Sequence, residues 1–180
     1  MSLLPSSRDK IVDAAEKVVI KVGAAHMTLD AVAEKASVSK GGLLYHFPSK
    51  EALLKAMVER RMQRLKEAQE KKCAELQNGG TREIKAHILS TLARNRKTDR
   101  INASLLAAAA HNPKLLAPVR EYHRKRLNKL IPAELRFERA AVIVLAADGL
   151  RLLELLSLSP FNENQRKEVT EELLRLADEI

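Results

Sequence analysis

The residues best suited to chemistry lie between positions 39 and 50, where short polar side chains and lysines accompany a short apolar run. Ser39 and Lys40 stand at the predicted start of a short helix. There, unpaired backbone N–H groups and a cation can together bind a phosphate. A helix this short can enter the major groove of DNA with its N-terminal residues at base edges. The pattern therefore indicates recognition of a polyanion.

The rest of the chain offers no arrangement typical of an enzyme. The histidines outside this segment have no carboxylate or second histidine at metal-ligand spacing, which predicts no metal site: His26, His87, His111 and His123. Acidic pairs such as Glu171–Glu172 fit solvated helix faces. Neither a G-x-G-x-x-G sequence nor a Walker-type phosphate loop is present. We therefore expect neither catalysis nor a cofactor.

Composition predicts an all-α protein. The 180 residues are rich in Ala, Leu, Glu, Lys and Arg, which favour helices, and aromatic residues make up only 3%. The single cysteine, Cys73, excludes an intramolecular disulfide and a cysteine-based zinc site, and we expect it to be half-exposed without a role. No signal peptide and no 18-residue apolar run is seen, which predicts a cytoplasmic protein.

Charge is unevenly distributed along the chain. The formal net charge is +9, with +2 in residues 1–60, +11 in residues 61–130 and −4 in residues 131–180. A basic protein favours anionic partners such as nucleic acid. Because the surplus lies in the middle of the sequence, charge alone does not identify the segment that contacts a phosphate.

Residues 28–47 have the pattern of a helix-turn-helix. An amphipathic helix over 7–22, with Ser7 as N-cap and Gly23 as a left-handed C-cap, precedes it. Thr28 is expected to cap a second helix in which the small Ala33 allows close packing of the next one. The turn is expected at Ser37, Val38 and Ser39, and Leu43 is expected to be buried. Pro48 ends the third helix.

Further helices are expected along the rest of the chain. Ser49 caps a fourth that reaches about Leu76, and Asn78-Gly79-Gly80 is a clear break. The remaining helices are predicted near 81–97, 101–111, 113–130, 134–158 and 163–179. Pro113 fits a first helical turn, whereas Pro118 is expected to kink its helix.

The run TLDAVAEKASVSKGGLLYHFPSKEAL over residues 28–53 resembles the DNA-binding domain of the tetracycline-repressor (TetR) family. Tyr45-His46-Phe47 followed by Ser49-Lys50-Glu51 is highly specific, and the likeness covers about residues 8–56. One departure is Ser37, where the family usually has glycine; a serine in a left-handed turn costs ~1 kcal/mol.

The resemblance implies a DNA-binding domain over 1–50 and a ligand-binding and dimerisation domain over 51–180. It implies a dimeric transcription regulator, usually a repressor, with double-stranded operator DNA, a second copy of itself and a small-molecule effector as partners. It places Thr28 and Lys50 on phosphates. The expected DNA face of the recognition helix comprises Ser39, Lys40, Gly41, Gly42, Tyr45 and His46.

Alternatives remain for individual side chains. Tyr45 could be a core aromatic, but its helical position away from Leu43 and Phe47 favours the DNA face. His46 could pack under the turn while it contacts a phosphate, and Lys50 could be an ordinary surface lysine. Two glycines in a recognition helix cost stability, so close approach of DNA explains Gly41 and Gly42 better than a turn does.

The C-terminal helices offer more apolar residues than one face of a small bundle can bury. Pairing with a second copy would bury the excess, with Leu145, Leu152, Leu156 and Leu173 in the dimer interface. Polar residues that could point inward from an apolar pocket are His87, Asn102, Ser104, His111 and Tyr122, unless they simply fill the core. Such a pocket suits an aliphatic or anionic molecule better than a cationic drug. Gly149 could allow close helix packing, with Asp148 paired to Arg151 or a ligand.

Two rival functions remain. One is a small helical enzyme or ligand-binding protein whose helix-turn-helix is only structural. The other is a nonspecific DNA-coating protein that depends on the net charge of +9.

Overall fold

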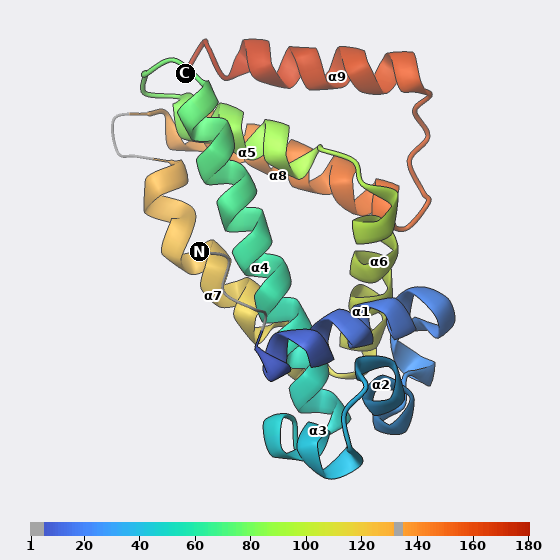
Figure 1. The fold of residues 1–180 in the computed structure, drawn as a ribbon. Coiled ribbons are helices and arrows are strands. Elements are labelled where there is room, and N and C mark those ends of the chain that lie inside the picture. The colour runs from blue at the N-terminus through green and yellow to red at the C-terminus, as the bar shows by residue number, and fades with distance from the viewer. Residues whose placement is uncertain (1–5, 132–134) are drawn as a thin grey trace. The chain divides into compact units, whose positions relative to one another are not determined.

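The computed structural model describes residues 6–131 and 135–180, except for the side chain of Asn128, and every regular element in these ranges is a helix (Figure 1). This confirms the all-α prediction. The elements in chain order are α1 (Ser7–His26), α2 (Leu29–Ala36), α3 (Lys40–His46), α4 (Lys50–Glu75), α5 (Arg82–Thr91), α6 (Arg96–His111), the 3₁₀ helix η1 (Pro113–Leu116), α7 (Ala117–Leu130), α8 (Phe137–Leu155) and α9 (Glu163–Leu176).

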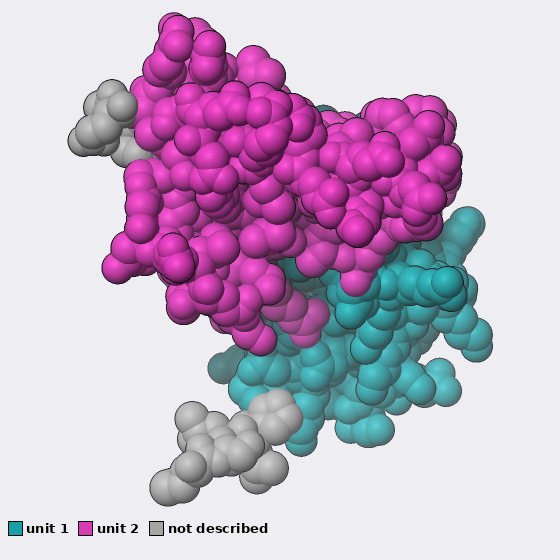
Figure 2. All heavy atoms as spheres, turned by 90° about the horizontal axis from the view of Figure 1, so that it is seen from above, with its two compact units in different colours: residues 1–62, 95–120 teal, residues 63–94, 121–180 magenta. Residues whose placement is uncertain are grey.

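The helices form two compact units, each built from two stretches of chain (Figure 2). The first unit contains residues 1–62 and 95–120, and the second contains 63–94 and 121–180. Helices α4 and α7 each contribute to both units. The expected division into 1–50 and 51–180 concerns function and stays a prediction.

The core of the first unit joins the helix-turn-helix to α6. Val32, Ala33 and Leu43 are buried, as the sequence predicts, together with Ile101 and Leu105 of α6. Helix α1 packs on both α2 and α6. The helix-turn-helix segment therefore shares one hydrophobic core with a helix that follows it by about 50 residues.

Side-chain caps fix the ends of the short helices. The Thr28 hydroxyl accepts a hydrogen bond from the Ala31 amide (3.2 Å), as predicted, but the cap of α1 is Ser6 and not Ser7. Ser37 adopts a left-handed conformation (φ 56°, ψ 45°), which confirms the predicted turn. The amide of Val38 closes this turn on the Ala33 carbonyl at 3.1 Å.

Gly23 interrupts α1 without ending it. Its backbone lies at φ 80°, ψ 161°, and the chain then continues in helical form to His26. The predicted C-cap is therefore a kink, in a conformation that is almost restricted to glycine.

Several helix boundaries differ from the prediction; for example, the helix expected over 101–111 begins at Arg96. The helix expected over 81–97 ends at Thr91, because the Asn95 side chain caps a new helix by accepting from the Thr98 amide (3.1 Å). Pro118 kinks nothing, since α7 begins at Ala117 and a proline is tolerated in a first turn. Pro113 stands at the start of η1, as predicted.

The second unit packs α5, α8 and α9 around one core. Helix α9 begins with a capping box formed by Asn162 and Gln165, a signal that the sequence analysis missed. Cys73 is buried rather than half-exposed, and this burial raises the pKa of its thiol. No helix of the described part of the chain is long and apolar enough to cross a membrane.

Candidate DNA-binding site and effector cavity

The start of α3 presents its polar groups to the surface. The Ser39 hydroxyl accepts from the Gly42 amide (3.0 Å), so this serine caps the helix. Lys40 is exposed and forms an ion pair with Asp30 (2.9 Å). Tyr45 is 86% exposed, which excludes the core alternative. These side chains form an accessible surface at one helix.

The two glycines of α3 differ in their surroundings. A Cβ at Gly41 would meet no other atom within 4 Å, whereas one at Gly42 would lie 3.2 Å from the Ser39 hydroxyl. Packing within the chain therefore explains Gly42 but not Gly41. The open space at Gly41 fits the expected close approach of DNA.

His46 and Lys50 take intermediate positions. His46 is half-buried and meets the Tyr45 ring edge to face, with centroids 5.2 Å apart. The Lys50 ammonium donates to the Ala25 carbonyl at 2.5 Å, so this cation satisfies a carbonyl at the end of α1. No sequence pattern around Lys50 or Ala25 predicts this contact. Thr28 is exposed at the start of α2.

Two of the expected effector residues lie together. Ser104 and His111, both on α6, line a cavity of about 580 Å³ within the first unit. Asn102, on the same helix, is half-buried, and its Oδ1 is a buried atom that has no hydrogen-bond partner in the part of the chain that the structure describes.

The other two expected effector residues belong to the second unit. His87 is 3% exposed, and its Nε2 lies 3.0 Å from an Asp148 carboxylate oxygen. Among the described residues, its Nδ1 is buried without a hydrogen-bond partner, as is the hydroxyl of Thr91 one turn later. The Tyr122 hydroxyl donates to the Gln69 side chain (3.3 Å) and accepts from Arg126.

Asp148 therefore has a different partner from the one expected. It pairs with His87, while Arg151 bonds to Glu154 at 3.4 Å. A Cβ at Gly149 would meet no described atom within 4 Å, so none of the helices in residues 6–131 and 135–180 packs closely there.

Three of the expected dimer residues are exposed on α8. Leu145, Leu152 and Leu156, which follows the last residue of α8, are 68%, 45% and 45% exposed. Val142 (65%) extends the same stripe at helical spacing. Leu173 instead lies in the core of the second unit. The structure therefore gives Leu173 a packing role within one chain.

Two clusters of charge were not predicted. Arg60 of α4 bonds to Asp13 and lies 3.2 Å from Asp9, which fastens α4 to α1. Glu154, almost fully buried, bonds to Arg166 and to Arg94 (2.8 Å). Such pairs depend on which helices meet, so helical periodicity cannot reveal them.

Metal binding has no support in the described ranges. They contain no group of three or more His, Cys, Asp or Glu side chains that could hold a metal ion.

Comparison with known proteins identifies the class as helix-turn-helix transcription regulators. Residues 11–57 match the family model described as bacterial regulatory proteins, tetR family. Residues 81–178, more than half of the chain, match the tetracyclin repressor-like C-terminal domain. The chain belongs to the TetR family.

Solved structures share the fold of this chain. A regulator from Streptomyces coelicolor A3(2), described as putative, superposes with a TM-score of 0.74 at 20% identity, over 96% of this chain and 99% of that one. The multidrug binding protein EbrR, complexed with ethidium, gives 0.67 at 25% identity, over 95% and 98%. The fatty acid degradation regulator FadR from Bacillus halodurans gives 0.65 at 18%, over 98% and 95%. No curated protein sequence matches the chain.

Proposed function

We propose that this protein is a repressor that binds a palindromic operator as a homodimer and leaves it when an effector binds. The observation that carries DNA recognition is the surface of α3, where Tyr45 is 86% exposed and Gly41 is open. A large aromatic side chain gains nothing from exposure to water, so a partner surface is the better explanation.

The exposed stripe on α8 supports the homodimer. Val142, Leu145, Leu152 and Leu156 form an apolar surface of the kind that a two-fold related copy covers. Two recognition helices would then read half-sites about 34–36 Å apart, or somewhat more.

Release by an effector would act by population shift. A molecule that binds only the conformation with the wrong spacing of recognition helices lowers the fraction of dimers that fit both half-sites. The expected effector residues remain His87, Asn102, Ser104, His111 and Tyr122.

An aliphatic or anionic effector is supported by the scarcity of aromatic residues outside the DNA-reading segment. The rival is a cationic aromatic molecule, which the likeness to EbrR complexed with ethidium favours. A thermal-shift screen of fatty acids, acyl thioesters, neutral metabolites and cationic dyes separates the two. Stabilisation by cationic dyes alone, with release from DNA, would overturn the aliphatic choice.

The decisive experiment is retardation of DNA fragments that flank the gene, at ~150 mM salt and with competitor DNA. Specific retardation of one palindromic fragment supports the proposal, and footprinting then locates the operator. Equal retardation of all fragments identifies a nonspecific coating protein, because such binding depends on charge alone. Absence of any retardation favours the rival in which the helix-turn-helix is only structural.

A further inference from the structure

We propose that the cavity in the first unit binds one aliphatic carboxylate, with its chain among the alanines of α1 and α6 and its head group at Lys50. This deepens the proposed function by placing an effector inside the DNA-reading unit, where release follows from direct competition for Lys50 instead of a population shift between dimer conformations. Only the predicted effect of the carboxylate on DNA binding rests on the proposed function; the binding site itself does not.

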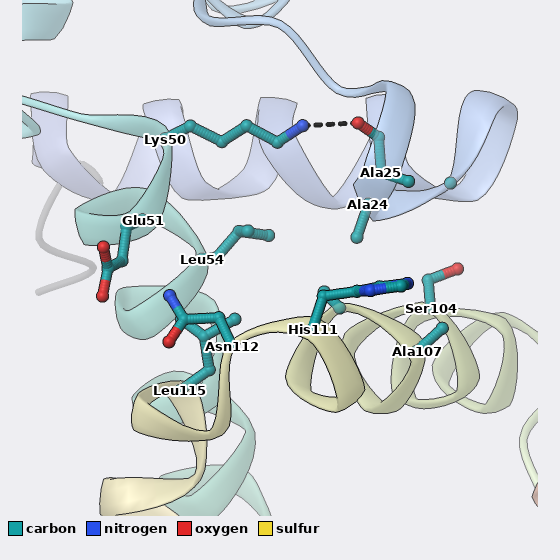
Figure 3. A pocket seen from close by; sticks show the side chains of 12 residues that line it. Ala24, Ala25, Lys50, Glu51, Leu54, Ser104, Ala107, His111, Asn112 and Leu115 are labelled. Carbon is teal, nitrogen blue, oxygen red and sulfur yellow. Dashed lines mark hydrogen bonds between the residues drawn. The ribbon is translucent and has the colours of Figure 1, made fainter.

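Small side chains create the cavity. Its walls are Ala24 and Ala25 from the last turn of α1, and Ala107 and Ala108 from α6, with Leu54 and Leu115 completing the apolar lining (Figure 3). The kink at Gly23 directs that last turn, and the alanine run of α6 provides no side chain long enough to fill the space. A volume of about 580 Å³ lies within the usual range for small-molecule sites.

The polar groups at this cavity favour an anion. Figure 3 shows the Lys50 side chain extended to the Ala25 carbonyl, which its ammonium contacts at 2.5 Å. That acceptor is neutral, and within the described ranges Lys50 forms no ion pair. A carboxylate in the cavity would give this cation a charged acceptor, and so an ion pair, in place of a hydrogen bond to a neutral carbonyl oxygen.

The remaining polar side chains are compatible with this head group. The His111 ring and the Ser104 hydroxyl lie along α6 and can donate to a carboxylate (Figure 3). Glu51 is the one acidic residue of the lining, and its carboxylate points away from the Lys50 ammonium and from His111 (Figure 3). A cationic ligand would have to approach Lys50 without a counter-charge beside it.

Occupation of the cavity has a direct consequence for DNA binding. Lys50 is the expected phosphate anchor, and one ammonium cannot hold a bound carboxylate and a DNA phosphate in the same place. The carboxylate therefore competes with DNA for this cation without requiring any change in the second unit.

The binding test uses the full chain without DNA, and isothermal titration calorimetry with decanoate, octanoate and decylammonium. Ala107→Phe places a ring in the cavity lining, whereas Ala110→Phe places the same ring on the same helix outside the lining; both alanines are exposed, so the two substitutions are matched in burial. Lys50→Met removes the charge and keeps the length of the side chain. Circular dichroism checks the fold of each variant.

We expect one decanoate per chain. Octanoate should bind about tenfold more weakly, because it lacks two methylene groups. Ala107→Phe and Lys50→Met should each weaken decanoate binding about tenfold or more, while Ala110→Phe should match the wild type. Equal binding to the wild type and a folded Ala107→Phe variant, or equal binding of decylammonium, overturns the proposal.

A second measurement separates this site from the proposed function. Decanoate should release the wild-type protein, but not Ala107→Phe, from its operator fragment. If decanoate binds in the calorimeter but does not release the protein from DNA, the binding site is supported and the proposed competition between decanoate and DNA is overturned. Failure to retard any fragment overturns the proposed function, while the calorimetry still decides the site.

Discussion

Tyr45 is the residue on which sequence discrimination is expected to depend. Its side chain is 86% exposed and contacts only the edge of His46 among aromatic rings in the described part of the chain. Tyr45→Ala should therefore abolish most discrimination between operator and random DNA and change the free energy of unfolding by less than about 0.5 kcal/mol. Competition binding and thermal unfolding measure the two effects. A large loss of stability would show that Tyr45 is a structural residue after all.

Lys50 should contribute to affinity without contributing to specificity. When Lys50 binds a phosphate, it releases a counterion from the DNA. Lys50→Ala should therefore weaken binding to all DNA sequences about equally and lower the slope of log affinity against log salt concentration by about 1 per recognition helix. Lys55→Ala is the matched control, since Lys55 is exposed on the same helix and does not line the cavity. A changed base preference in Lys50→Ala would contradict the anchor assignment.

Helix α1 depends on the kink at Gly23. The backbone at φ 80°, ψ 161° is almost inaccessible to other residues, although a Cβ there would meet nothing within 4 Å. Gly23→Ala should therefore cost about 1–3 kcal/mol of stability through the backbone alone. Gly41→Ala, also free of contacts but at a helical position, should instead stabilise by up to ~1 kcal/mol. Chemical denaturation compares the two variants, and equal effects would contradict this account.

Helices α8 and α9 are joined by the buried carboxylate of Glu154. Burial opposes its ionisation, but hydrogen bonds from Arg166 and Arg94 outweigh this and hold the pKa of Glu154 below its ordinary value of 4.5. A carboxyl group whose pKa is lower in the folded state than in the unfolded state stabilises the fold at pH values above its unfolded-state pKa. That stability is lost as pH falls through the folded-state value.

Acid should therefore destabilise the second unit below about pH 4.5, and Glu154→Gln should remove this pH dependence. At neutral pH the variant should lose about 1–3 kcal/mol, because the hydrogen bonds from Arg166 and from the partly exposed Arg94 lose their charged acceptor. Glu163→Gln is the control: Glu163 pairs with the same Arg94 but is 80% exposed, so its loss should be much smaller. Unfolding curves from pH 3 to pH 7 provide the measurement.

At the scale of the whole molecule, assembly should depend on the exposed face of α8. Leu145→Asp places a charge in the centre of the proposed dimer interface, where it would be buried without a partner. Sedimentation should then show a monomer at micromolar concentration, with operator affinity lost and the fold retained. Leu127→Asp is the control, since Leu127 is 49% exposed on α7. A Leu145→Asp monomer with unchanged operator affinity would overturn the dimer.

The sequence by itself determined the helical class and the helix-turn-helix, because these depend on local information. Thr28 caps α2 and Pro48 follows the end of α3, as these residue types favour, and Ser37 forms the predicted left-handed turn although its side chain opposes that conformation. The exposure of Tyr45 follows from the same helical periodicity.

Only the tertiary structure decided contacts between distant segments. Asp148 meets His87 rather than Arg151, and Lys50 reaches the Ala25 carbonyl. The cavity exists because alanines of α1 and α6 face one another in the first unit. Periodicity shows which residues share one face of a helix. Which other helix packs against that face depends on the apolar area that the two helices bury together, and this area is set by the tertiary structure.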